Sequence, residues 1–207
     1  ITDNGSINFG IPHSYNPDGW QGTFAPGRND SVKDQEKYML TEEKMKTLKE
    51  NLKLLNEVKS EFKEERRRYI DYSLRRFNKN FTSKEVEDSI TDLIISLESL
   101  LNRDPFEVTE KTSQRAAVLI VKNDLNECKK FIKNCYGIRS EIVHGKKREI
   151  KIKEDGEILT DEEIKNKLEE YVRIVLRKIL EFQLKYKTQS DILAKIDQHI
   201  MDRNIEL

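Results

Sequence analysis

The chain is 207 residues long, and 37% of its residues are charged against 36% that are hydrophobic. Its 38 basic and 38 acidic side chains cancel, so overall charge gives no argument for nucleic-acid binding, and any such surface must be local. No run approaches the roughly 18 apolar residues that a membrane-spanning helix needs. The composition predicts a helix-rich protein with one sizeable core, and we expect it in the cytoplasm without a membrane partner.

The first 40 residues differ in composition from the remainder of the chain. Residues 1–31 hold five of the eight glycines, three of the four prolines and the only tryptophan. Such a segment does not sustain a helix, and it predicts a linker or extension from an upstream region. We expect a helical domain over residues 41–207, and an upstream sensor domain that this fragment lacks.

Thr41 is a plausible N-cap for the first helix of this domain. Apolar side chains then recur every seven residues, which predicts one long amphipathic helix reaching about Phe77, at Leu48, Leu55, Phe62 and Tyr69. It could serve as a dimer-forming arm or pack on its own domain. The neighbouring Arg66, Arg67 and Arg68 could contact phosphate or form a solvated helix face. A capping box at Thr82-Ser-Lys-Glu85 predicts the start of the next helix.

Pro105 marks a break, and a third helix is expected from Thr109 or Thr112 to Lys122. A fourth helix should begin near Leu125 and carry Cys128 and Cys135 on its inner face. These two cysteines lie two helical turns apart, roughly 10 Å, which is too far for a disulfide. We therefore expect free, buried thiols in a reducing compartment.

Gly145 is suited to end the fourth helix as its C′ residue. Alternating Ile150 and Ile152, followed by Asp155-Gly156, predict a short β-hairpin. A capping box at Thr160-Asp-Glu-Glu163 predicts the start of a long helix, and a last helix should run from Asp191 to about Met201. The fold class predicted by these signals is all-α with one small hairpin.

Arg139 and His144 stand five positions apart near the end of the fourth helix, followed by the basic residues Lys146, Lys147 and Arg148. Arg139 falls on the helix face that Cys128 and Cys135 make apolar, and such a conflict between pattern and residue is typical of functional sites. Five residues rotate by about 140° and rise about 7.5 Å along a helix, so Arg139 and His144 do not share a narrow face.

An arginine and a histidine suit phosphodiester chemistry. Histidine, with an ordinary pKa of about 6.5, exchanges protons near neutral pH, and arginine grips two phosphate oxygens at once. The chain has no glycine-rich phosphate loop, no cluster of His and Cys for a metal, and no Ser-His-Asp arrangement. RNA brings its own nucleophile in the 2′-hydroxyl, so we expect neither a metal nor another cofactor.

The segment Tyr136-Gly-Ile-Arg-Ser-Glu-Ile-Val-His-Gly145 resembles the Arg-x4-6-His signature of the HEPN superfamily, and more narrowly its ApeA-like domains. The likeness covers about Arg66 to Tyr186 and includes three further segments in the family's order, Arg75-Arg-Phe77, Asp92–Leu101 and Gln114-Arg-Ala-Ala117. The resemblance implies a dimeric all-α bundle with a long N-terminal helix. It also implies a metal-independent endoribonuclease of prokaryotic antiphage or abortive-infection defence, which leaves a 2′,3′-cyclic phosphate.

By the same resemblance, Arg139 stabilises the phosphate, His144 assists proton transfer, and Glu98 orients Arg139, with the site shared between two protomers. Ser140 takes a place where many members carry Asn, Asp or His, and is a weaker polar helper. Lys146, Lys147 and Arg148 are expected to attract RNA. Two alternatives remain open at this point: a non-catalytic HEPN domain for RNA binding or dimerisation, and a structural module in which Arg139 pairs with Glu98 inside the core.

Overall fold

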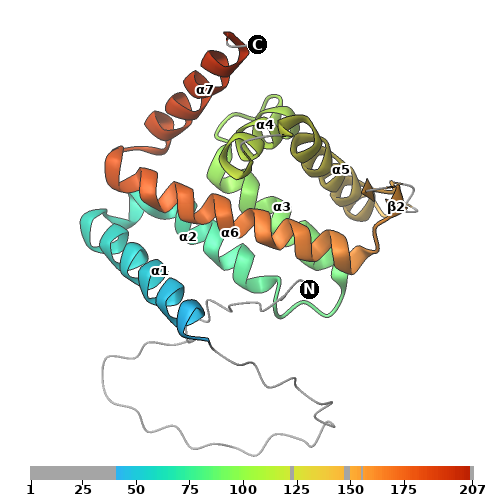
Figure 1. Cartoon of the computed structure of the whole chain (residues 1–207), viewed down its shortest axis with the longest axis horizontal. Coiled ribbons are helices and arrows are strands. Elements are labelled where there is room, and N and C mark those ends of the chain that lie inside the picture. The colour runs from blue at the N-terminus through green and yellow to red at the C-terminus, as the bar shows by residue number, and fades with distance from the viewer. Residues whose placement is uncertain (1–40, 122–123, 147–149, 155, 206–207) are drawn as a thin grey trace, which may run out of the picture.

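The computed structural model describes residues 41–121, 124–146, 150–154 and 156–205 (Figure 1). The expected linker over residues 1–40 lies outside this range. Within it the chain forms helices and one small hairpin, which confirms the all-α fold class. In chain order the elements are α1 (Glu42–Glu61), α2 (Glu64–Lys79), α3 (Val86–Leu101), α4 (Val108–Ile120), α5 (Leu125–Val143), β1 (Lys153–Glu154), β2 (Glu157–Ile158), α6 (Asp161–Lys185) and α7 (Gln189–Ile205).

Helix α3 is the centre of the bundle. Its inward residues are fully buried, at Ile90, Leu93, Ile94, Leu97, Leu100 and Leu101. It packs against α2, α4, α5 and α6, and Figure 1 shows the long α6 crossing over α2 and α3 while α4 and α5 form a pair beside them. The bundle therefore holds the motif helix α5 against the core through α3 and α4.

The expected single helix from Thr41 to Phe77 is wrong, because the chain breaks at Phe62 and Lys63. Phe62 is extended, with φ −116° and ψ 130°, and Lys63 is also non-helical. The Nε of Arg67 donates to the Phe62 carbonyl at 3.2 Å, which satisfies one of the groups that the break exposes. Helix α1 packs mainly on α6, whereas α2 packs mainly on α3, so the break changes the direction in which the chain meets the bundle.

The capping box expected at Thr82 is also wrong. The hydroxyls of Thr82 and Ser83 both donate to the carbonyl of Lys79, at 3.0 and 3.1 Å, so they close the end of α2. Helix α3 begins later, at Val86, and Glu85 makes no side-chain cap. The capping box at Thr160 is confirmed, because its hydroxyl and the Glu163 carboxylate make the two reciprocal bonds.

Helix α7 projects from the bundle in Figure 1 and is held to it at its first residue and at its middle. The guanidinium of Arg115, only 6% exposed, donates to both carboxylate oxygens of Asp197 at 2.7 Å and to the Leu101 carbonyl at 2.7 Å. The side-chain amide of Gln189 donates to the carbonyls of Ser99 and Leu100. These bonds satisfy orphan carbonyls at the end of α3 and fix the first half of α7 beside it.

Candidate functional site

The end of α5 has the geometry that its glycine predicts. Gly145 adopts φ +61°, in the left-handed region that glycine occupies without strain. Its N–H donates to the Ile142 carbonyl at 3.0 Å, and the N–H of Lys146 donates to the Glu141 carbonyl at 2.9 Å. These two bonds make a Schellman motif, which ends the helix with His144 as its C-cap.

Arg139 lies at the edge of the core and faces α3. Its Nη1 is 3.6 Å from Oε2 of Glu98, and both side chains are 32% exposed. That separation makes an ion pair but is too long for a hydrogen bond. The structure therefore brings together Arg139 and Glu98, on two different helices. They meet at the edge of the core, and this pairing is also the one that the structural alternative expects.

Two polar atoms of this ion pair, Oε2 of Glu98 and Nε of Arg139, are buried without a hydrogen-bond partner among the described residues, and the buried hydroxyls of Tyr136 and Thr112 lie beside them and close to each other. Burial raises the pKa of Tyr136 above its usual range, and the charge of Glu98 adds to this, while the nearby Thr112 hydroxyl and Arg139 act in the opposite direction. Buried polar atoms are normally paired, so such a concentration indicates a place for water or a ligand.

A groove of about 500 Å³ opens beside this cluster. Its lining includes Arg139 and Glu98, Tyr72 of α2, and residues 102–104 of the turn before α4, which bring a second arginine, Arg103, and a second carboxylate, Asp104. The guanidinium of Arg139 is thus accessible, and its donors are not all used by Glu98. Arginine carries five N–H donors in a planar fork, which fits the oxygens of a phosphate.

His144 does not line this groove. It is exposed at the far end of α5, on the turn that leads toward the hairpin, and Ser140 is exposed as well. Lys146 is exposed on the same turn, whereas Lys147 and Arg148 lie outside the described residues. Within one chain, therefore, Arg139 meets Glu98 but not His144, as the helix pitch predicts.

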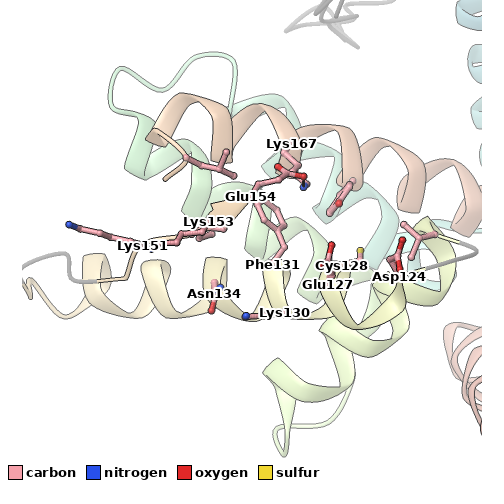
Figure 2. Close-up of a pocket in the computed structure, with 14 residues that line it drawn as sticks. Asp124, Glu127, Cys128, Lys130, Phe131, Asn134, Lys151, Lys153, Glu154 and Lys167 are labelled. Carbon is pink, nitrogen blue, oxygen red and sulfur yellow. Dashed lines mark hydrogen bonds and ion pairs between the residues drawn. The ribbon is translucent and has the colours of Figure 1, made fainter. Parts of the chain in front are cut away.

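A second cavity, of about 450 Å³, lies on another side of α5, against the segment before β1 and α6 (Figure 2). Lys167 pairs with Glu154 and lies over the rings of Phe131 and Tyr171, at 5.0 and 5.9 Å from their centroids. Burial raises the pKa of the Cys128 thiol in its wall to about 11. Four lysines and three carboxylates line this cavity, and one lysine-carboxylate pair among them is the ion pair of Lys167 with Glu154.

Tyr136 and Thr112 complete the polar cluster, and the sequence reasoning did not select either as a site residue. Tyr136 stands three positions before Arg139, so the i, i+3 rule could have placed both on one helix face. Thr112 belongs to α4, and only the packing of α4 on α5 brings it there. No spacing pattern in the sequence could therefore have placed Thr112 beside Tyr136.

No family model matches this chain, and no curated protein or solved structure matches it either. In the described part of the chain, no group of three or more His, Cys, Asp or Glu side chains is arranged to hold a metal ion. Among the same residues, no helix combines the length and the apolar character that crossing a membrane requires.

Proposed function

We propose that this chain is an endoribonuclease that needs no metal and uses the 2′-hydroxyl of RNA as its nucleophile. The observation that supports this most strongly is Arg139, a one-third-exposed arginine at an open groove, whose Glu98 partner is beyond hydrogen-bond distance. An arginine held in this way keeps donors available for a phosphate. The HEPN-like motif around it supplies the reaction class.

The reaction transfers the phosphate within the RNA itself. The 2′-oxygen bonds to phosphorus and loses its proton to a base, while the bond from phosphorus to the 5′-oxygen breaks and that oxygen receives a proton. The products are a 2′,3′-cyclic phosphate and a 5′-hydroxyl. Arg139 stabilises the charge that grows on the phosphate oxygens, and His144 gives or takes a proton. Glu98 positions Arg139, and Ser140 is a minor polar helper.

A second copy of the chain brings His144 to the groove of Arg139. His144 lies on the exposed end of α5, about 140° around the helix from Arg139, so one helix cannot aim both at one phosphate. A twofold dimer presents the same residues on both chains and can pair the arginine of one with the histidine of the other. Lys146, with Lys147 and Arg148, would attract RNA beside this site.

The setting we propose is the cytoplasm of a prokaryote, with the domain acting as the effector of an antiphage or abortive-infection protein. The defence role rests on the family resemblance alone. The two cysteines are free and buried, which suits a reducing compartment.

The first test is cleavage of a synthetic RNA in the presence of EDTA, followed by analysis of the fragment ends. We expect cleavage to persist with the chelator and to leave 2′,3′-cyclic phosphate ends. A matched oligonucleotide with one 2′-deoxy sugar at the cut position should resist cleavage there. Fragments with 3′-hydroxyl ends, or activity that the chelator abolishes, would contradict the proposed chemistry.

Mixing two inactive variants tests the shared site. Arg139→Ala and His144→Ala should each lose activity as homodimers. In a mixed dimer one site keeps both an intact arginine and an intact histidine, so re-equilibrated mixtures should recover up to about a quarter of the wild-type rate. If the mixture stays inactive although mixed dimers form, the site is not shared. Protein that remains folded and binds RNA without cutting it would support the non-catalytic alternative.

A further inference from the structure

A second depression, of about 510 Å³, adjoins the groove at Arg139. It lies where the first half of α2 meets the turn between α6 and α7. Tyr72 and Arg103 line both hollows, so the two meet at these side chains and together outline a path from α2 to Arg139. From Arg66 to Tyr72 the path follows α2 for six residues, about 9 Å, before it turns toward Arg139.

The far part of this path is strongly basic. Its lining has four cationic side chains and one carboxylate, at Arg66, Arg68, Arg103, Lys187 and Glu65. Arg66, Arg68 and Lys187 are exposed, and none of them has an acidic partner among the described residues. Arg103 donates to the hydroxyl of Ser190, which leaves its charge uncompensated. In a chain of zero net charge, this is a local positive surface.

Tyr72 stands at the junction of the two hollows with 36% of its surface exposed. Arg75 and Arg76 lie near its ring, with guanidinium carbons 5.8 and 5.3 Å from the centroid. Arg76 also donates to its hydroxyl, from Nε at 3.1 Å and from Nη2 at 2.9 Å. These contacts hold the exposed ring of Tyr72 in one orientation, between Arg75 and Arg76 of its own helix and the cations that line the second depression.

We propose that this path, from Arg66 and Arg68 past Tyr72 to Arg139, binds single-stranded RNA and leads it to the cleavage site. The inference rests on the proposed function for its end point at Arg139. Unpaired arginines attract successive phosphates, and an exposed ring stacks on a base that is not already paired in a duplex. The occupant that fits both features is a single strand.

The experiment measures binding separately from cleavage. A fluorescent 2′-O-methyl RNA of about 12 nucleotides has no free 2′-hydroxyl, so it binds without being cut, and its affinity is followed by anisotropy at several KCl concentrations. The test variants are Arg66→Gln with Arg68→Gln, Tyr72→Ala, and Tyr72→Phe. The matched control is Lys130→Gln with Lys153→Gln, which removes the same charge from exposed lysines at the cavity of Figure 2.

The double arginine variant should lose roughly tenfold in affinity, and its salt slope should fall by about 1.4, the value for two contacts to a single strand. Tyr72→Ala should weaken binding roughly fivefold or more, while Tyr72→Phe keeps the stacking ring but loses the hydroxyl that Arg76 holds, and should weaken binding clearly less than Tyr72→Ala. The lysine control loses the same two positive charges as the arginine variant, and its affinity should change less than twofold. Circular dichroism and urea midpoints check that each variant folds.

Equal losses in the arginine and lysine pairs would overturn the proposal, since the effect would then be overall charge. Unchanged binding in the arginine pair or in Tyr72→Ala would overturn it as well. Failure of the cleavage reaction is a separate outcome. If no RNA is cut but the arginine pair weakens binding as expected, the path stands and the proposed function fails. If the double variant Arg66→Gln with Arg68→Gln cuts RNA at the wild-type rate when RNA is limiting, the path fails and the proposed function stands.

Discussion

Replacing Arg139 with alanine should separate chemistry from stability. The side chain is one-third exposed and lies 3.6 Å from Glu98 without a hydrogen bond, so the pair resembles a surface ion pair worth about 0–1 kcal/mol. Its Nε is already buried without an acceptor, and removing that atom offsets part of the loss. We expect the free energy of unfolding to fall by less than about 1 kcal/mol. The cleavage rate should fall about 10²–10³-fold, as for other single donors that stabilise transition-state charge.

Arg115→Ala is the matched structural control. Arg115 is 6% exposed and makes three hydrogen bonds at 2.7 Å, two to Asp197 and one to the Leu101 carbonyl. Asp197 itself is 38% exposed, so water compensates part of the loss on that side. The buried carbonyl loses its partner as well, and we expect the variant to lose at least about 2 kcal/mol of stability.

The assay is urea unfolding followed by circular dichroism at 222 nm, with cleavage rates measured well below the unfolding transition. Arg139→Lys serves as a further variant, because it keeps the charge but loses the two-pronged grip on phosphate, and its rate should fall between those of wild type and alanine. The reasoning is refuted if Arg139→Ala loses as much stability as Arg115→Ala. It is refuted equally if the alanine variant cuts RNA at the wild-type rate.

Three further outcomes follow from the structure. Gly145→Ala should cost about 1 kcal/mol of unfolding free energy from its φ of +61° alone, since a Cβ there meets nothing within 4 Å, and a wild-type urea midpoint would contradict this. Hydrogen bonds from Lys129 and Lys133 lower the pKa of Glu110 to about 2, so the stabilisation that its carboxylate provides is present above about pH 4.5 and is lost toward pH 2. The urea midpoint of Glu110→Gln should therefore lie slightly below that of wild type at pH 7 and converge with it at pH 2. The loss of unfolding free energy at pH 7 should be under about 1 kcal/mol, because Glu110 is half-exposed. With the pKa of its buried thiol raised to about 11, Cys128 should react with Ellman's reagent at pH 8 only as fast as the fold opens, and complete labelling on mixing would show the thiol to be accessible.

Signals carried within one turn of the chain predicted local structure well. The glycine at position 145 and the capping box at Thr160 correspond to a Schellman motif and a reciprocal cap. The turn signal before Gly156 corresponds to the short hairpin of β1 and β2. In each case the deciding energy is local, a backbone angle that favours glycine or a side chain that reaches its own backbone.

Signals that are compatible with more than one structure failed or were incomplete. The seven-residue apolar repeat continued through Phe62, yet the helix breaks there, and α1 then packs mainly on α6 while α2 packs mainly on α3. Thr82 has the sequence of an N-cap, but its hydroxyl bonds back to the end of α2. Local propensity could not choose between these outcomes, since both satisfy the nearby backbone.

By itself the sequence determined an all-α protein and a helix that ends at Gly145 with Arg139 on its inner side. Only the tertiary structure decided what surrounds Arg139. Glu98, Tyr136, Thr112 and Tyr72 come from four different helices, and the packing of these helices around α3 creates both the unpaired cluster and the groove. The physical reason is that helix periodicity defines which face turns inward, whereas the neighbours that meet on that face depend on how whole helices pack.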